Sequence, residues 1–116
     1  MSTYTLYHNP RCSKSRQALS LLEEKNINPV IVEYLRTPPK VSELKKIIKL
    51  LNISPREIIR TKESLYKDLN LADSNLSDED IIKNLCQHPI LIERPIIFTN
   101  KQAVIGRPPE NILELL

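Results

Sequence analysis

One cysteine of the chain lies between basic residues at the point where a helical pattern begins. The stretch HNPRCSKSRQALSLLEE, residues 8–24, places Cys12 between Arg11 and Lys14. The thiolate is the reactive form of cysteine, and both a helix N-terminus and nearby cations favour it over the thiol. Ser15 occupies the second cysteine position of a C-x-x-C pair, so the predicted site has one thiol and a hydroxyl placed to donate a hydrogen bond to the sulfur. This pattern predicts a nucleophilic cysteine rather than a buried, inert one.

The other residues capable of chemistry have simpler explanations. Cys86 lies far from Cys12 in the sequence, which fits neither a disulfide scaffold nor zinc-ligand spacing, so no metal site is expected. Packing within a helix that begins at Ser77 explains Cys86, and His88 at the end of that helix is expected to cap carbonyl groups or to face solvent. His8 ends a predicted strand just before the cysteine turn. It is expected to tune the thiolate or orient the loop, and a structural hydrogen bond fits it equally well.

Composition and charge limit the class of protein. The chain has 116 residues, of which 41% are hydrophobic and 27% charged, as in ordinary globular proteins of one domain. No apolar run is long enough to cross a bilayer, and MSTYTLYH lacks the pattern of a secretory signal, so we expect a cytoplasmic protein without a membrane partner. The net charge of +3 is mild and dispersed, which argues against a nucleic-acid partner and is compatible with a small anionic ligand.

The elements that must position the cysteine follow from the hydrophobic pattern. Residues 3–8 (TYTLYH) alternate like a strand, residues 13–25 carry one apolar stripe of a helix, and residues 28–35 (NPVIVEYL) are β-branched and bounded by prolines. A β-α-β unit of this kind joins parallel strands. The cysteine therefore falls on its first strand-to-helix turn.

The middle of the chain is expected to be helical. Leu44, Ile47, Ile48 and Leu51 follow helical spacing, and helix start signals occur at Ser54 and Ser77.

The end of the chain is expected to return to strands. Residues 95–99 and 103–105 predict a hairpin, and PPENILELL predicts a short closing helix with Ile112, Leu113 and Leu116 facing the core. The order β-α-β, helices, β-β-α predicts an α/β protein of one domain over residues 1–116. It would have a thioredoxin-like fold with a mixed four-stranded sheet and a helical insertion at about residues 40–88.

Four separated blocks resemble the glutathione- and glutaredoxin-coupled arsenate reductases, the ArsC family. The blocks are YHNPxCxxSR from residue 7, YLxTPP from residue 34, QHPILIxRPI from residue 87, and GRP from residue 106. The resemblance implies that Cys12 attacks an arsenate oxyanion held by Arg60, Arg94 and Arg107. It also implies that Pro95, after Arg94, is a cis proline. The supporting residues expected around this site are His8, Asn9, Ser15 and Pro95.

The cysteine loop departs from the usual family pattern. Positions 11, 13 and 14 are Arg, Ser and Lys, whereas the best-studied arsenate reductases resemble A-C-G-T-S at this loop. The NPRCSKSR form indicates a separate branch, whose added charge from Arg11 and Lys14 suits a larger anion or the carboxylates of glutathione. The resemblance further implies glutathione as reducing co-substrate, glutaredoxin as partner, and no bound cofactor.

Two other functions fit the same fold. A glutaredoxin-like thiol transferase acting on mixed disulfides needs only Cys12 and Ser15, and the three arginines argue against it because disulfide exchange needs no oxyanion cage. An Spx-type regulator binds RNA polymerase instead of catalysing a reaction. Those regulators usually resemble C-x-x-C at the first turn and lack the His-Asn-Pro lead-in seen here.

Overall fold

The structure, a computed structural model, describes residues 3–116 in two compact units. Unit 1 combines the chain up to Thr37 with Arg94–Leu116, and unit 2 is Pro38–Glu93. The helical insertion expected at about residues 40–88 falls within unit 2, and the expectation of one domain over the whole chain stays a prediction.

Unit 1 contains a mixed four-stranded sheet, as the sequence predicts. Its strands lie in the order β2-β1-β3-β4, with β1 parallel to β2 and antiparallel to β3, and with β4 antiparallel to β3. The strands are β1 (Thr5–Tyr7), β2 (Val30–Val32), β3 (Ile96–Phe98) and β4 (Ala103–Ile105). The β-α-β unit and the hairpin are therefore both present.

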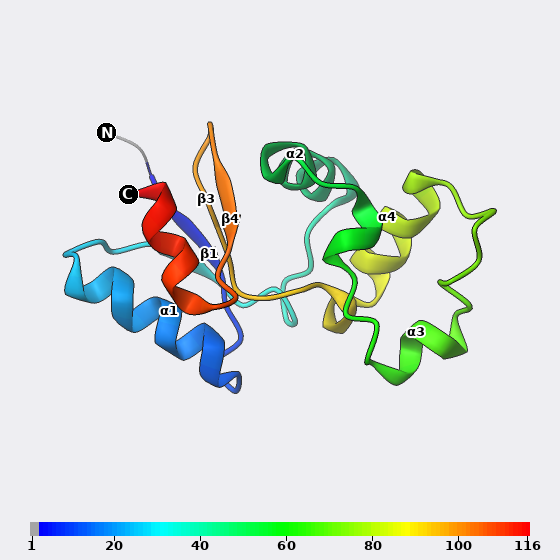
Figure 1. Cartoon of the computed structure of the whole chain (residues 1–116), viewed down its shortest axis with the longest axis horizontal. Helices are drawn as coiled ribbons and strands as arrows, with labels where there is room; N and C mark the ends of the chain where they lie inside the picture. The colour runs from blue at the N-terminus through cyan, green and yellow to red at the C-terminus, as the bar shows by residue number, and fades with distance from the viewer. Residues whose placement is uncertain (1–2) are drawn as a thin grey trace. The chain divides into compact units, whose positions relative to one another are not determined.

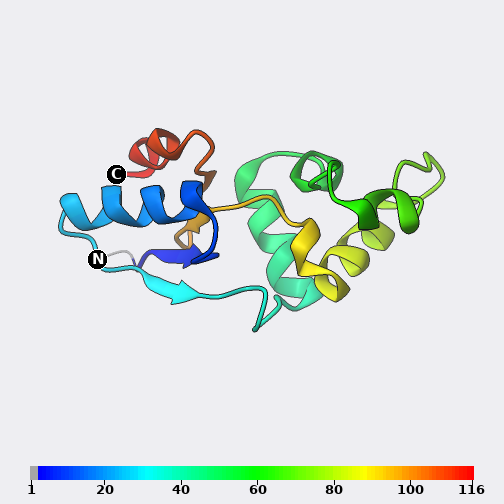
Figure 2. The ribbon, with the colours of Figure 1, turned by 90° about the horizontal axis from the view of Figure 1, so that it is seen from below.

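Two helices cover one face of this sheet. Helix α1 (Ser13–Glu24) lies beside the 3₁₀ helix η3 (Pro109–Leu115), and both pack on β1 and β3 (Figures 1 and 2). The buried side chains between them are Leu6, Ala18, Leu22, Ile97, Ile112 and Leu115. The prediction for the last segment was partly wrong. Leu113 and Leu116 are exposed and Leu115 is buried, because the segment winds as a 3₁₀ helix in which residues three apart share a face.

Strand β2 is shorter than the range 28–35 predicted from its residue types. It forms the edge of the sheet, and the carbonyl of Glu33 accepts hydrogen bonds from the N–H groups of Arg36 and Thr37, at 2.9 and 3.0 Å. These bonds turn the chain directly after Val32. Val30 and Ile31 are about half exposed. Their β-branched side chains therefore indicated a strand correctly, but they do not indicate buried positions.

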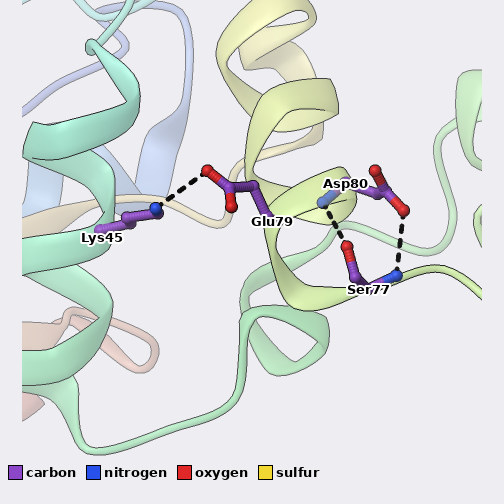
Figure 3. Close-up of polar contacts among 4 residues, drawn as sticks. All are labelled: Lys45, Ser77, Glu79 and Asp80. Atoms are coloured by element: carbon purple, nitrogen blue, oxygen red, sulfur yellow. Dashed lines mark hydrogen bonds and ion pairs between the residues drawn. The ribbon is translucent and has the colours of Figure 1, made fainter.

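Unit 2 is helical. Helix α2 (Val41–Leu51) packs on α4 (Asp78–Gln87), and the Nζ of Lys45 lies 3.0 Å from Oε1 of Glu79 across the pair (Figure 3). The start signal at Ser77 is confirmed. Its hydroxyl accepts from the N–H of Asp80 at 3.1 Å, while its own N–H donates to the Asp80 carboxylate (Figure 3).

The start signal at Ser54 opens only the short 3₁₀ helix η1 (Pro55–Ile58). The helix stops because Ile59 forms a β-bridge with Ile92 and the N–H of Arg60 donates to the carbonyl of Leu91 at 2.7 Å. Two further short helices, α3 (Ser64–Asp68) and η2 (Pro89–Leu91), complete the unit.

Candidate active site

The cysteine turn is built by backbone hydrogen bonds between the end of β1 and the start of α1. The N–H of His8 donates to the carbonyl of Val32 at 2.9 Å, which continues the β1–β2 ladder by one bond. The N–H of Cys12 then donates to the carbonyl of Asn9, and the carbonyl of Cys12 accepts from the N–H of Arg16, both at 3.0 Å. Cys12 is the N-cap residue of α1 and is partly exposed, so its thiol stands at the helix N-terminus as predicted.

The surroundings of Cys12 favour the thiolate. Burial alone would raise the pKa of the thiol, but the backbone N–H groups of Ser15 and Lys14 and the side chain of Arg94 donate hydrogen bonds to the sulfur, and the positive charge of Arg94 adds to them. The result is a pKa below the ordinary cysteine value. The cation that contacts the sulfur is thus Arg94, which is remote in sequence, rather than the adjacent Arg11 or Lys14.

Ser15 supports the site in a different way from the one predicted. Its fully buried hydroxyl lies 2.7 Å from Nδ1 of His8 and accepts from the N–H of Asn9 at 3.0 Å, so it braces the loop, while its backbone N–H faces the sulfur of Cys12. Burial lowers the pKa of His8; Glu33 acts against this and Arg16 adds to it. The contact with Ser15 fits the structural hydrogen bond expected as one of the two roles of His8, and the lowered pKa favours its neutral imidazole.

Arg94, two residues before β3, and Arg107, two residues after β4, come together at the same end of the hairpin. The Arg94–Pro95 peptide bond is cis, as the resemblance implied, and Arg107–Pro108 is also cis. The Nη1 of Arg107 donates to the backbone carbonyl of Arg94 at 3.3 Å. Unit 1 thus joins Cys12, Arg94 and Arg107 through direct contacts.

A glycine permits this arrangement. The N–H of Gly106 donates to the carbonyl of Pro95 at 2.8 Å, and a Cβ at position 106 would lie 2.9 Å from Cγ of Pro95 and 3.1 Å from Cγ2 of Ile112. A side chain at position 106 would therefore require Pro95 or Ile112 to shift. Sequence reasoning quoted Gly106 only as part of a motif, although its being the one glycine of the chain was a signal that its backbone is closely approached.

The remaining candidates lie in unit 2. Arg60 follows the Ile59–Ile92 bridge, and its Nη1 is buried without a hydrogen-bond partner in residues 3–116. Its assignment to an oxyanion rests on the family resemblance. Cys86 is partly buried in α4, and burial, with a smaller effect from Glu43, raises the pKa of its thiol.

No group of His, Cys, Asp and Glu side chains in the described part of the chain is arranged to hold a metal ion. Among the same residues, no helix is long and apolar enough to cross a membrane.

The sequence model of the ArsC family matches residues 7–115. The chain belongs to the ArsC family. The match includes the cysteine turn, Arg94 with its cis proline, and Arg107. These site residues therefore all lie within the part of the chain that matches the family.

Relatives of this ArsC chain match it over nearly its full length. The arsenate reductase of Neisseria meningitidis serogroup A is 49% identical over 117 residues, covering all of both chains. The protein of Escherichia coli K12 named "Uncharacterized protein YfgD" is 52% identical over 112 residues, covering 96% of this chain and 94% of its own. The solved structure of arsenate reductase from Vibrio cholerae is 50% identical, with a TM-score of 0.96 over 99% of this chain and 98% of its own. The protein is thus an arsenate reductase-like member of the family with its thioredoxin-like fold.

Proposed function

We propose that this chain reduces arsenate, with Cys12 as nucleophile. The observation that carries the proposal is the contact of Arg94 with the sulfur of Cys12, because one guanidinium stabilises the thiolate and lies beside the sulfur that an oxyanion has to approach. Arsenate is tetrahedral and anionic like phosphate, and the planar fork of arginine suits such ions. Arg107, held against the carbonyl of Arg94, supplies a second guanidinium. Arg60 is assigned to the same oxyanion by the resemblance and is tested by substitution.

The first step joins sulfur to arsenic. The Cys12 thiolate attacks the arsenic of dihydrogen arsenate, a proton converts one oxygen into water, and the water leaves. The product is a Cys12–arsenate adduct in which arsenic is still pentavalent. Arg94 contributes to this step in two ways: it lowers the pKa of the Cys12 thiol, and its positive charge balances the charge of the oxyanion.

The second step moves two electrons. A glutathione thiol attacks the sulfur of Cys12, the sulfur–arsenic bond breaks with its electron pair going to arsenic, and the thiol proton passes to an arsenite oxygen. Trivalent arsenite and a Cys12–glutathione disulfide result. A glutaredoxin thiol then takes the glutathione by disulfide exchange and returns Cys12 to its reduced form. The scheme requires no metal or resident organic cofactor.

Turnover of arsenate and of a small glutathione mixed disulfide, measured side by side, tests the proposal. We expect arsenite production that depends on glutathione and glutaredoxin, that is abolished in Cys12→Ser and that is nearly unchanged in the control Cys86→Ser. Fast turnover of the mixed disulfide with none of arsenate would instead identify a glutaredoxin-like thiol transferase. Equal losses from the two cysteine variants would contradict the assignment of Cys12.

A further inference from the structure

Arg16 belongs to the YHNPxCxxSR block of the cysteine turn, and the mechanism above gives its side chain no task. The residue is exposed and lies near the start of α1. Its Nη1 donates to the backbone carbonyl of Pro10 at 2.9 Å, and its backbone N–H donates to the carbonyl of Cys12 at 3.0 Å. Arg16 therefore binds the chain on both sides of Arg11.

The carbonyl of Pro10 belongs to the central peptide of a β-turn. The turn spans residues 9–12 and is closed by the hydrogen bond from the N–H of Cys12 to the carbonyl of Asn9 at 3.0 Å. Type I and type II turns share such a bond and differ in the direction of the central peptide. The φ angle of Arg11 is not positive, which excludes type II here. Since the closing bond fits both directions, other contacts are needed to secure the one observed.

Side chains bind both polar groups of this central peptide. Oδ1 of Asn9 accepts from the N–H of Arg11 at 3.0 Å, and Nη1 of Arg16 binds the carbonyl of Pro10. A flip of the peptide would reverse the directions of the carbonyl and the N–H and would break both bonds. Because Arg11 is bonded directly to Cys12, the change in its backbone angles would also shift the thiol relative to α1.

We propose that Arg16 is a positioning residue for the nucleophile, which holds the Pro10 carbonyl and thereby keeps the sulfur of Cys12 in place at the N-terminus of α1. In that position the backbone N–H groups of Lys14 and Ser15 donate to the sulfur. Hydrogen bonds weaken steeply when the donor and acceptor move out of line, so a small shift of the thiol loses part of this stabilisation. The inference rests on the proposed function in one respect, which is that Cys12 is the attacking group.

Alkylation of Cys12 by iodoacetamide, followed across pH, tests the proposal without arsenate. Arg16→Met keeps a long side chain and removes the donor, so the thiol pKa should rise. The alkylation rate at neutral pH should then fall about two- to tenfold, the range that one hydrogen bond covers. Well above the thiol pKa, the rates of the variant and of wild type should converge. Arg16→Lys, which keeps a donor on a stem of similar length, should recover most of the rate, and an equal loss in both variants would overturn the proposal.

Asn9→Ala separates the effect of the turn from the charge of Arg16. This variant removes the other side-chain contact to the same peptide and removes no charge, so it should shift the alkylation profile of Cys12 in the same direction. A shift in Arg16→Met with none in Asn9→Ala would mean that the charge acts on the thiolate directly, and it would overturn the positioning role.

Two controls accompany these variants. Gln17→Met changes the next residue of α1, which is also exposed, and should leave the alkylation profile of Cys12 unchanged. An equal shift in this control would overturn the role of Arg16. Cys86 is partly buried in α4, so faster labelling of Cys86 in the same samples reports unfolding. If Arg16→Met unfolds, the profiles of Arg16→Lys and Asn9→Ala decide.

Steady-state kinetics distinguishes positioning from direct binding of the oxyanion. Arg16→Met should lower kcat and leave the KM for arsenate near that of wild type. A raised KM with an unchanged alkylation profile would place Arg16 in the oxyanion site and overturn the proposal. If the wild-type chain fails to reduce arsenate while Arg16→Met still shifts the profile of Cys12, the positioning role stands and the arsenate assignment is lost.

Discussion

Nδ1 of His8 and the hydroxyl oxygen of Ser15 lie 2.7 Å apart inside unit 1, and they join the end of β1 to the first turn of α1. The same hydroxyl accepts the N–H of Asn9 at 3.0 Å. The bond thus closes the cysteine loop from within. It also explains how a serine at the position of a second thiol contributes to the site without touching the sulfur through its side chain.

Ser15→Ala should therefore destabilise the fold. The change removes a fully buried hydroxyl and leaves Nδ1 of His8 and the N–H of Asn9 without this partner, at a cost of about 1 to 3 kcal/mol in the free energy of unfolding. Urea unfolding followed by circular dichroism measures the loss. Ser20→Ala, an exposed site on the same helix, is the control, and an equal effect of both variants would deny the bracing role of Ser15.

Arg94 should control the acidity of the thiol. Its side chain hydrogen-bonds to Cys12 and lowers the pKa of the thiol, so Arg94→Gln should raise that pKa. Because the thiolate is the nucleophile, the rate of Cys12 alkylation falls as pH drops through this pKa, and the falling limb should move to higher pH in the variant. Iodoacetamide labelling followed by peptide mass measurement checks this. Cys86, whose thiol pKa is raised, is the internal control and should keep its profile.

The guanidinium fork should matter beyond its charge. Arg60→Lys, Arg94→Lys and Arg107→Lys keep a cation but lose bidentate hydrogen bonding, so kcat/KM for arsenate should fall by an amount on the order of 1.5 to 3 kcal/mol in each. Steady-state kinetics at saturating glutathione and glutaredoxin gives the value. Wild-type efficiency in all three would mean that the oxyanion binds elsewhere.

Gly106→Ala tests the packing behind the arginines. The added Cβ would lie 2.9 Å from Cγ of Pro95 and 3.1 Å from Cγ2 of Ile112, so one of these neighbours has to shift. Overpacking of this kind costs about 1 to 3 kcal/mol of stability, and the displaced Pro95 should also lower kcat/KM for arsenate. Unfolding and kinetics are measured together. A variant as stable and active as wild type would show that the close approach is dispensable.

The local features of the fold were predictable because their causes are local. The apolar stripe of α1, the capping signal at Ser77 and the hairpin at residues 95–105 each depend on neighbouring residues, and each is found in the structure. Where the structure depends on strand pairing or on the type of helix that forms, the sequence alone was insufficient to predict it. The strand expected at 28–35 stops at Val32, and the helix expected from Ser54 is a four-residue 3₁₀ turn.

The site divides in the same way. Cys12 at a helix N-terminus follows from residue type and position, so it was predictable from the sequence. The partners of Ser15 were not, because which donor faces the sulfur depends on the exact turn of the loop. The contact between Arg107 and the carbonyl of Arg94 joins residues that are distant in the chain, and only the folded hairpin brings them together.

The reducing electrons should come from outside the chain. An internal route needs a second cysteine whose Cα approaches that of Cys12 to roughly 4.4 to 6.8 Å, and Ser15 at the nearby position has no thiol. Cys86 is the remaining cysteine, and it is held within α4 with a thiol pKa raised by burial, which disfavours the thiolate needed for attack. Turnover should therefore require glutathione and glutaredoxin, with thioredoxin alone a poor substitute.

Intact mass measurement distinguishes external reduction from the internal route through Cys86. The electron donor is glutathione with glutaredoxin in one sample and thioredoxin alone in the other. A sample stopped during turnover with glutathione but without glutaredoxin should carry one glutathione on Cys12, and Cys86→Ser should give the same adduct. Sustained turnover on thioredoxin alone, with a Cys12–Cys86 disulfide and no glutathione adduct, would mean that α4 opens to deliver its thiol and that the cycle proposed for Cys12 is wrong.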